Sequence, residues 1–142
     1  MSERRRILKA IKKCLSDTYE HFQNTMDALD EIGRGSMGTA MTPFVGGYGM
    51  NDPVDSYRKA LIELDSAEKS LKPLAIRVRD GRVNESHFQS DEAVKMLRDL
   101  IDFDYEVLIR RLSQREGRES VWYRLKETSQ KCEEIYQLVA EK

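Results

Sequence analysis

Residues 33–52, GRGSMGTAMTPFVGGYGMND, separate two long stretches of charged, helix-forming sequence. They hold six of the eight glycines and three of the six methionines, and Arg34 is the only charged residue before the closing Asp52. Helices in a bundle are usually joined by about 2–8 residues, so a connection of this length stands out. We expect one helix to end at a glycine cap on Gly33 and the next helix to begin after Asp52.

The composition indicates one small helical domain. The 142 residues are enough for a single domain with its own core, and we assign residues 1–142 to it. Charged residues make up 35% of the chain and apolar residues 39%, which is typical of helices that each carry a narrow apolar stripe. The net charge of −1 favours neither a nucleic-acid partner nor a membrane surface, so only the distribution of charge is informative.

The sequence shows no signal for a membrane or for secretion. No run of about 18 apolar residues is present, so we expect no membrane span. Lysines interrupt the apolar positions of the N-terminal MSERRRILKAIKKCL, which therefore lacks a signal-peptide core. We expect a cytoplasmic protein without a membrane partner.

Apolar residues recur at three- and four-residue steps in four segments, and we predict a helix over each: residues 3–32, 53–79, 91–113 and 119–141. Asp52-Pro53 is a strong helix start, and Pro73 is expected to kink or split the second helix near Lys69. Strand signals are absent. The pattern predicts an all-α fold, an antiparallel up-down four-helix bundle with an irregular Gly/Met-rich loop, residues 33–52, between its first two helices.

Two local features refine this prediction. Asp80-Gly81 marks a turn that opens a polar connection reaching Ser90. In the third helix the apolar rhythm aims either Asp104 or Tyr105 inward. We favour Tyr105, because a buried carboxylate would need a partner.

Residues suited to metal or nucleophilic chemistry are few. Cys14 and Cys132 fall on apolar helix faces at different heights in the bundle, so we expect two separate thiols without metal-type neighbours. The acidic residues in the middle of the helices lack the Glu-x-x-His pair of di-metal bundles. His21 is predicted at the rim of the bundle. Without a nucleophile elbow or a P-loop, we expect no enzymatic activity, no metal and no cofactor.

The run GRGSMG at residues 33–38 matches the dinucleotide-binding pattern G-x-G-x-x-G. That fingerprint works between a strand and a helix, where the helix N-terminus meets the phosphates. Here a predicted helix precedes it, so we do not expect a dinucleotide site. The apolar residues of the loop instead suit contact with a partner, because methionine adapts its shape to binding surfaces. These residues are Met37, Met41, Phe44, Val45, Tyr48 and Met50.

Basic residues gather in three blocks, within residues 1–13, 72–82 and 110–118. The up-down topology places the first two blocks at one end of the bundle and the third at the end that holds the loop. Cations are favoured at helix C-termini, which accounts for the second and third blocks. The first block lies at a helix N-terminus, where cations are disfavoured, and this suggests a surface that contacts anions. The candidate anion-binding residues are Arg4, Arg5, Arg6, Arg77, Arg79 and Arg82.

Arg82 and His87 are separated by four residues in the run RVNESH. This spacing resembles the catalytic Arg/His pair of HEPN-type ribonucleases, which are also helical bundles and dimers. The resemblance implies a remote alternative, RNA cleavage by Arg82 and His87. In that family the pair lies on a helix, whereas here it falls in a predicted turn.

The leading hypothesis is a non-enzymatic helical interaction or adaptor protein that self-associates as a homodimer, with residues 33–52 as its contact element. The alternative is nucleic-acid or phosphate-ligand binding through the basic end. The partner is thus another protein or a second copy of the chain, with nucleic acid as the alternative.

Overall fold

The computed structural model describes residues 2–41, 53–112, 114 and 117–141, with the side chains of residues 32–41 and 53–54 left out. Within these ranges the chain is all-helical, as predicted, and contains no strand. The described elements are α1 (Glu3–Met41), α3 (Pro53–Arg79), the 3-10 turn η1 (Glu85–His87), α4 (Asp91–Ile101), α5 (Tyr105–Leu112) and α6 (Arg118–Gln137). None of the described helices combines the length and the apolar character needed to cross a membrane.

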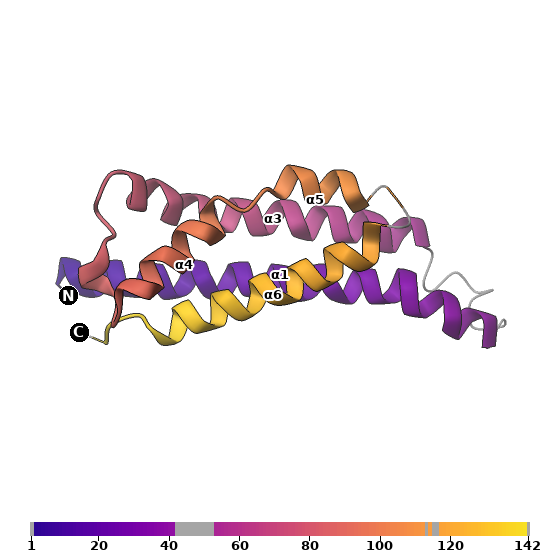
Figure 1. Cartoon of the computed structure of the whole chain (residues 1–142), viewed down its shortest axis with the longest axis horizontal. Helices are drawn as coiled ribbons and strands as arrows, with labels where there is room; N and C mark the ends of the chain where they lie inside the picture. Colours follow the sequence, from indigo (N-terminus) through magenta and orange to yellow (C-terminus); the bar gives the residue numbers. More distant parts are fainter. Residues whose placement is uncertain (1, 42–52, 113, 115–116, 142) are drawn as a thin grey trace.

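The two longest helices, α1 and α3, lie side by side and run in opposite directions (Figure 1). The last helix, α6, runs back along α1, and the shorter α4 and α5 pack on α6 and α3 respectively. The N-terminus, the connection after α3 and the C-terminus therefore meet at one end of the molecule. The predicted four-helix up-down bundle stays a prediction, because the third predicted helix is divided into α4 and α5.

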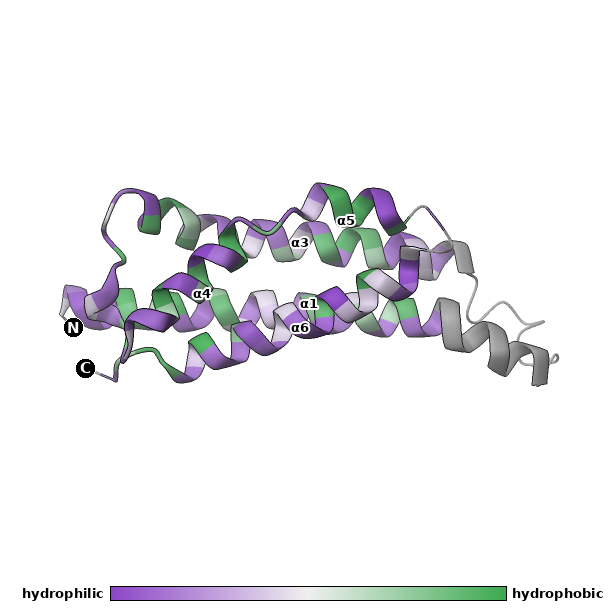
Figure 2. Ribbon diagram, in the orientation of Figure 1, coloured by the Kyte–Doolittle hydropathy of each residue, from purple (hydrophilic) through white to green (hydrophobic). Residues whose placement is uncertain are grey.

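One continuous core joins these helices. Apolar residues recur among polar ones along each helix (Figure 2), and about one residue in every helical turn is buried. The largest fully buried side chains come from all five helices and include Phe22, Leu64, Leu97, Leu112 and Leu125. Burying a side chain of this size contributes about 1.5–3 kcal/mol, so this shared core holds the helices together.

α1 is longer than predicted. It continues through Gly33 to Met41, whereas we expected it to end at Ile32 with a cap on Gly33. Glycine costs a helix about 1 kcal/mol relative to alanine, which weakens a helix without ending it. The predicted loop therefore begins later, and residues 42–52 lie outside the described part of the chain.

The predicted helix over residues 91–113 is wrong, because the chain leaves the helix at Asp102 and re-enters it at Tyr105. Asp104 explains the new start: its Oδ1 accepts a hydrogen bond of 3.1 Å from the Val107 N–H. An aspartate that caps in this way competes with continued helix. The expected choice between Asp104 and Tyr105 is confirmed, since Tyr105 is buried and Asp104 is exposed.

The other helix boundaries differ less. α3 runs through Pro73 without a break, so of the predicted kink or split near Lys69 the split is wrong. Lys69 and Pro73 are both exposed. α6 ends at Gln137, four residues before the predicted end at residue 141. The Asp80-Gly81 turn is confirmed, with Gly81 at φ +81°.

Candidate functional site

The structure describes little of the six residues that we predicted to contact a partner. Met37 and Met41 belong to the last turns of α1, and their side chains lie outside the described residues. Phe44, Val45, Tyr48 and Met50 lie outside them altogether. The run at residues 33–38 belongs to a helix, which agrees with our rejection of a phosphate-binding loop there.

The register between α1 and α3 shows where the last turns of α1 lie relative to the start of α3. Ser56 Oγ donates a hydrogen bond of 2.8 Å to Glu31 Oε2, so the first turn of α3 lies beside Glu31. The two helices are antiparallel, which places Pro53 level with about residue 34 of α1. At about 1.5 Å per residue, the rest of α1 up to Met41 would extend about 10 Å beyond the start of α3. Figure 1 shows the end of α1 lying beyond the start of α3.

The start of α1, the end of α3 and the connection after α3 hold the predicted anion-binding residues. These segments lie at one end of the molecule, here called the basic end (Figure 1). Arg4 Nη2 donates a hydrogen bond of 2.8 Å to the Ser86 carbonyl, which ties the first turn of α1 to the connection after α3. Arg82 instead pairs locally with Asp80, at 2.7 Å between Nη2 and Oδ2. Hydrogen bonds from Arg82 hold the pKa of Asp80 below its usual value, and the same pair raises the pKa of Arg82.

Arg77 is half-buried. Burial raises the pKa of the Cys14 thiol on α1, and the positive charge of Arg77 partly opposes that rise. Arg5, Arg6 and Arg79 are exposed. The basic end thus combines exposed arginines with others that have structural contacts.

The connection after α3 contains His87, whose burial we did not predict from the sequence. The side chain of Asn84 accepts a hydrogen bond from the Ser86 N–H, and the Asn84 N–H donates to His87 Nδ1 at 3.2 Å. His87 is only 6% exposed, and Val83 and Phe88 beside it are also buried. An Asn followed three residues later by a polar side chain is a capping-box pattern, the one signal in the sequence for this turn.

The end of the chain packs against this turn. The Ala140 N–H donates to the His87 carbonyl at 2.9 Å, and the Gln89 N–H donates to the Leu138 carbonyl at 2.7 Å. Phe88 and Val139 form an isolated antiparallel bridge. Arg82 and His87 are therefore both engaged in local structural contacts, and we do not propose the ribonuclease suggested by their spacing.

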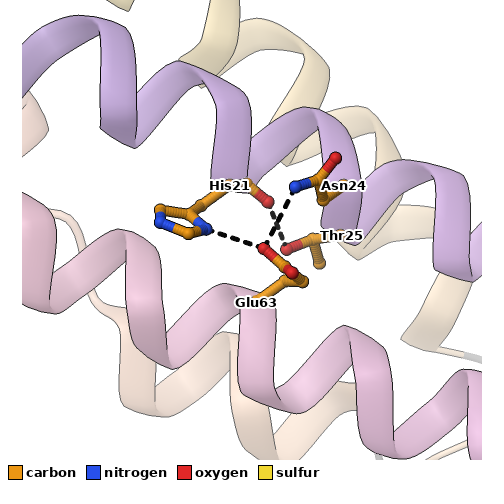
Figure 3. A network of polar contacts seen from close by, with 4 residues as sticks. All are labelled: His21, Asn24, Thr25 and Glu63. Atoms are coloured by element: carbon orange, nitrogen blue, oxygen red, sulfur yellow. Dashed lines mark hydrogen bonds and ion pairs between the residues drawn. The ribbon is translucent and has the colours of Figure 1, made fainter.

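A polar junction between α1 and α3 contains the second histidine (Figure 3). Glu63 Oε2 lies 2.7 Å from His21 Nδ1 and accepts a hydrogen bond of 3.3 Å from Asn24 Nδ2. The His21 side chain is 31% exposed and that of Glu63 20%, which confirms the predicted position at the rim. A hydrogen bond of this kind contributes about 0.5–1.5 kcal/mol, enough to favour this helix register.

A groove of about 180 Å³ lies between α1 and α6. It is lined by Leu15, Ser16, Tyr19, Cys132, Glu133 and Tyr136. Lys12 Nζ lies 5.6 Å from the ring centroid of Tyr136, so one face of this ring already makes a cation–π contact. Burial raises the pKa of the Cys132 thiol to about 12, which makes it a poor nucleophile.

The described residues contain no group of three or more His, Cys, Asp or Glu side chains that could hold a metal ion. Cys14 and Cys132 are separate thiols, as predicted. A scan against protein-family models, a search of curated proteins and a search of solved structures each found no match.

Proposed function

We propose that the chain is a non-enzymatic α-helical interaction protein that forms a homodimer through residues 33–52. The observation that supports this most is the projection of α1 past the start of α3, fixed by the hydrogen bond between Ser56 and Glu31. The last turns of α1 belong to residues 33–52, the predicted contact element. Those residues are apolar and almost uncharged on an otherwise highly charged chain, which is the composition of a contact surface.

We treat the body as an antiparallel four-helix bundle whose third helix is broken into α4 and α5. In such a bundle α1, α3 and α6 form a rigid support for whatever is attached at one end. We also place the protein in the cytoplasm, where its two thiols would remain reduced.

The ionisable groups that enzymes most often use have structural contacts here. His21 is hydrogen-bonded to Glu63, and the buried His87 accepts a backbone hydrogen bond from Asn84. The two thiols have raised pKa values, which lowers their reactivity. These contacts support a role in binding rather than in catalysis.

Light scattering after gel filtration tests self-association. We expect the wild type to be a dimer and a variant lacking residues 36–50 to be a monomer. The circular dichroism spectrum of this variant should show that helices α3–α6 are still formed. A full-length variant with Met37, Met41, Phe44, Val45, Tyr48 and Met50 changed to serine should also be monomeric. The matched control changes Ser36, Thr39 and Thr42 to alanine and should remain a dimer. A monomeric wild type, or a dimer that survives both changes, would refute the proposal.

A second candidate is binding of nucleic acid or another polyphosphate at the basic end. The contact between Arg4 and Ser86 supports it, because it brings the basic start of α1 to the basic end of α3. Arg5, Arg6 and Arg79 lie exposed there. Each phosphate neutralised by a cation would contribute about 0.7–0.9 to the slope of log affinity against log salt.

Fluorescence polarisation with a single-stranded oligonucleotide at 50–200 mM salt tests this candidate. Changing Arg5 and Arg6 to alanine should weaken binding and lower the salt slope. The matched control removes the same charge at the opposite end, by changing Arg110 and Arg111 to alanine. If the changes at Arg5 and Arg6 weaken binding no more than the changes at Arg110 and Arg111, the attraction is non-specific. Absence of binding at low salt would dismiss the candidate.

A further inference from the structure

We infer that His87 is an acid-sensitive latch that holds the connection after α3 and the C-terminal residues of the chain in place at the basic end. The inference is independent of the proposed function, since it concerns only described residues of the body. It rests on the role of one ring nitrogen and on the contacts that surround it.

His87 Nδ1 can accept the hydrogen bond from the Asn84 N–H only while it carries no proton. In the neutral ring the proton therefore lies on Nε2. Protonation at Nδ1 would place two N–H groups face to face at a distance of 3.2 Å. The His87 residue is only 6% exposed, so we expect its ring to reach solvent only when the turn opens. Acid and the folded turn thus compete for the same lone pair.

Several contacts depend on the closed turn. The carbonyl of His87 accepts from the Ala140 N–H, and Gln89 beside it bonds the backbone of residues 137–139 in three ways. Phe88 is buried against this segment and bridges Val139. On the other side, Ser86 supplies the carbonyl that Arg4 binds. Opening the turn would loosen the C-terminal residues and the first turn of α1 together.

The charged groups on the surrounding elements do not offset this competition. Arg4 brings a positive charge to the carbonyl of Ser86, the residue before His87, and the Asp80–Arg82 pair is internally neutral. The acids near the ends of the elements that contact the turn are all exposed and screened by solvent. They are Glu3 in α1, Glu85 in η1, Asp91 and Glu92 at the start of α4, and Glu141 after α6.

Amide hydrogen exchange by NMR between pH 7.5 and 5.0 tests the latch, because histidine changes charge in this range. After correction for intrinsic exchange rates, the opening equilibrium at the Gln89 and Ala140 amides should rise by up to about tenfold per pH unit, since opening takes up one proton. Amides in the middle of α1 should not follow. Unchanged protection at Gln89 and Ala140 would overturn the inference.

The variant His87→Asn isolates the titrating group, because its Oδ1 can accept the Asn84 N–H at every pH in the range. We expect protection at Gln89 and Ala140 to become independent of pH. The matched variant His21→Asn removes the other histidine and should retain the wild-type response. If His87→Asn does not fold, imidazole nitrogen shifts of the wild type replace it. A protonated Nδ1 at pH 7.5 would overturn the inference, as would the same acid response in a folded His87→Asn.

Discussion

Tyr105→Phe should stabilise the protein, which is the opposite of what most core substitutions do. The Tyr105 ring is 4% exposed and stacks on Phe22, with 6.1 Å between the ring centroids and 14° between the planes. It also meets Phe103 edge to face at 5.0 Å. Its buried hydroxyl has no hydrogen-bond partner among the described residues. The substitution keeps both ring contacts and removes only this oxygen.

The size of the effect follows from the hydroxyl. In the unfolded chain it is hydrated, and a buried polar group without a hydrogen bond costs about 1–3 kcal/mol. Burial, followed by the negative charges of the Cys132 thiolate and Glu68, raises the pKa of Tyr105 well above its usual value, which agrees with a poorly solvated position. Allowing for partial relaxation, we expect the free energy of unfolding to rise by about 1 kcal/mol and Tm by about 2–4 °C.

Urea unfolding followed by circular dichroism, together with thermal melts, measures this change. Tyr123→Phe is the matched control, because Tyr123 is 59% exposed and losing its hydroxyl should change stability by less than about 0.5 kcal/mol. A loss of more than about 1 kcal/mol in Tyr105→Phe would refute the reasoning, since it would mean that the hydroxyl makes a net stabilising hydrogen bond. Tyr105→Leu should be destabilising, because it removes the ring contacts as well.

Three further predictions concern stability. Burial raises the pKa of Cys132 from 9.0 to about 12, so the unfolded chain loses this proton first. The stability that this group contributes is complete below pH 9 and falls by up to about 1.4 kcal/mol per pH unit above it. Urea midpoints at pH 8 and 10.5 should therefore show a smaller loss of stability in Cys132→Ala than in the wild type. Asp104→Ala removes the cap that receives the Val107 N–H and should cost about 1 kcal/mol in urea unfolding, whereas Asp99→Ala on the exposed side of α4 should be nearly neutral. Gly81→Ala should cost about 1–2 kcal/mol, because its φ of +81° is disfavoured for a residue with a Cβ; a neutral result in thermal melts would mean that the turn can rearrange.

The helices could be predicted because their signals are local. Apolar residues at three- and four-residue steps identified every long helix, and the same rhythm correctly selected Tyr105 over Asp104 as the buried residue. The errors fall where a local signal was present but its strength was misjudged. Gly33 was taken for a helix end, yet a glycine costs a helix only about 1 kcal/mol, which weakens it without ending it. Pro73 was taken for a possible break, yet its cost of about 3 kcal/mol can be outweighed by packing along α3.

The polar sites were harder, since each joins residues far apart in the chain. The partner of His21 is Glu63, and the turn that buries His87 is covered by residues near Val139. Nothing in the spacing around either histidine indicates these partners. The basic end was predicted from topology, but only the structure showed that Arg4 braces the Ser86 carbonyl and that Arg82 is paired with Asp80.

By itself, the sequence determined that this protein is helical, where most of its helices lie and which of their faces are buried, because these depend on residues within one or two turns of each other. It also set apart residues 33–52 as unlike the rest of the chain. Only the tertiary structure decided that α1 projects past α3 and that His87 closes a turn against the C-terminal residues. Those features depend on how far each helix extends before its neighbour begins, and on contacts that form only once the helices have packed.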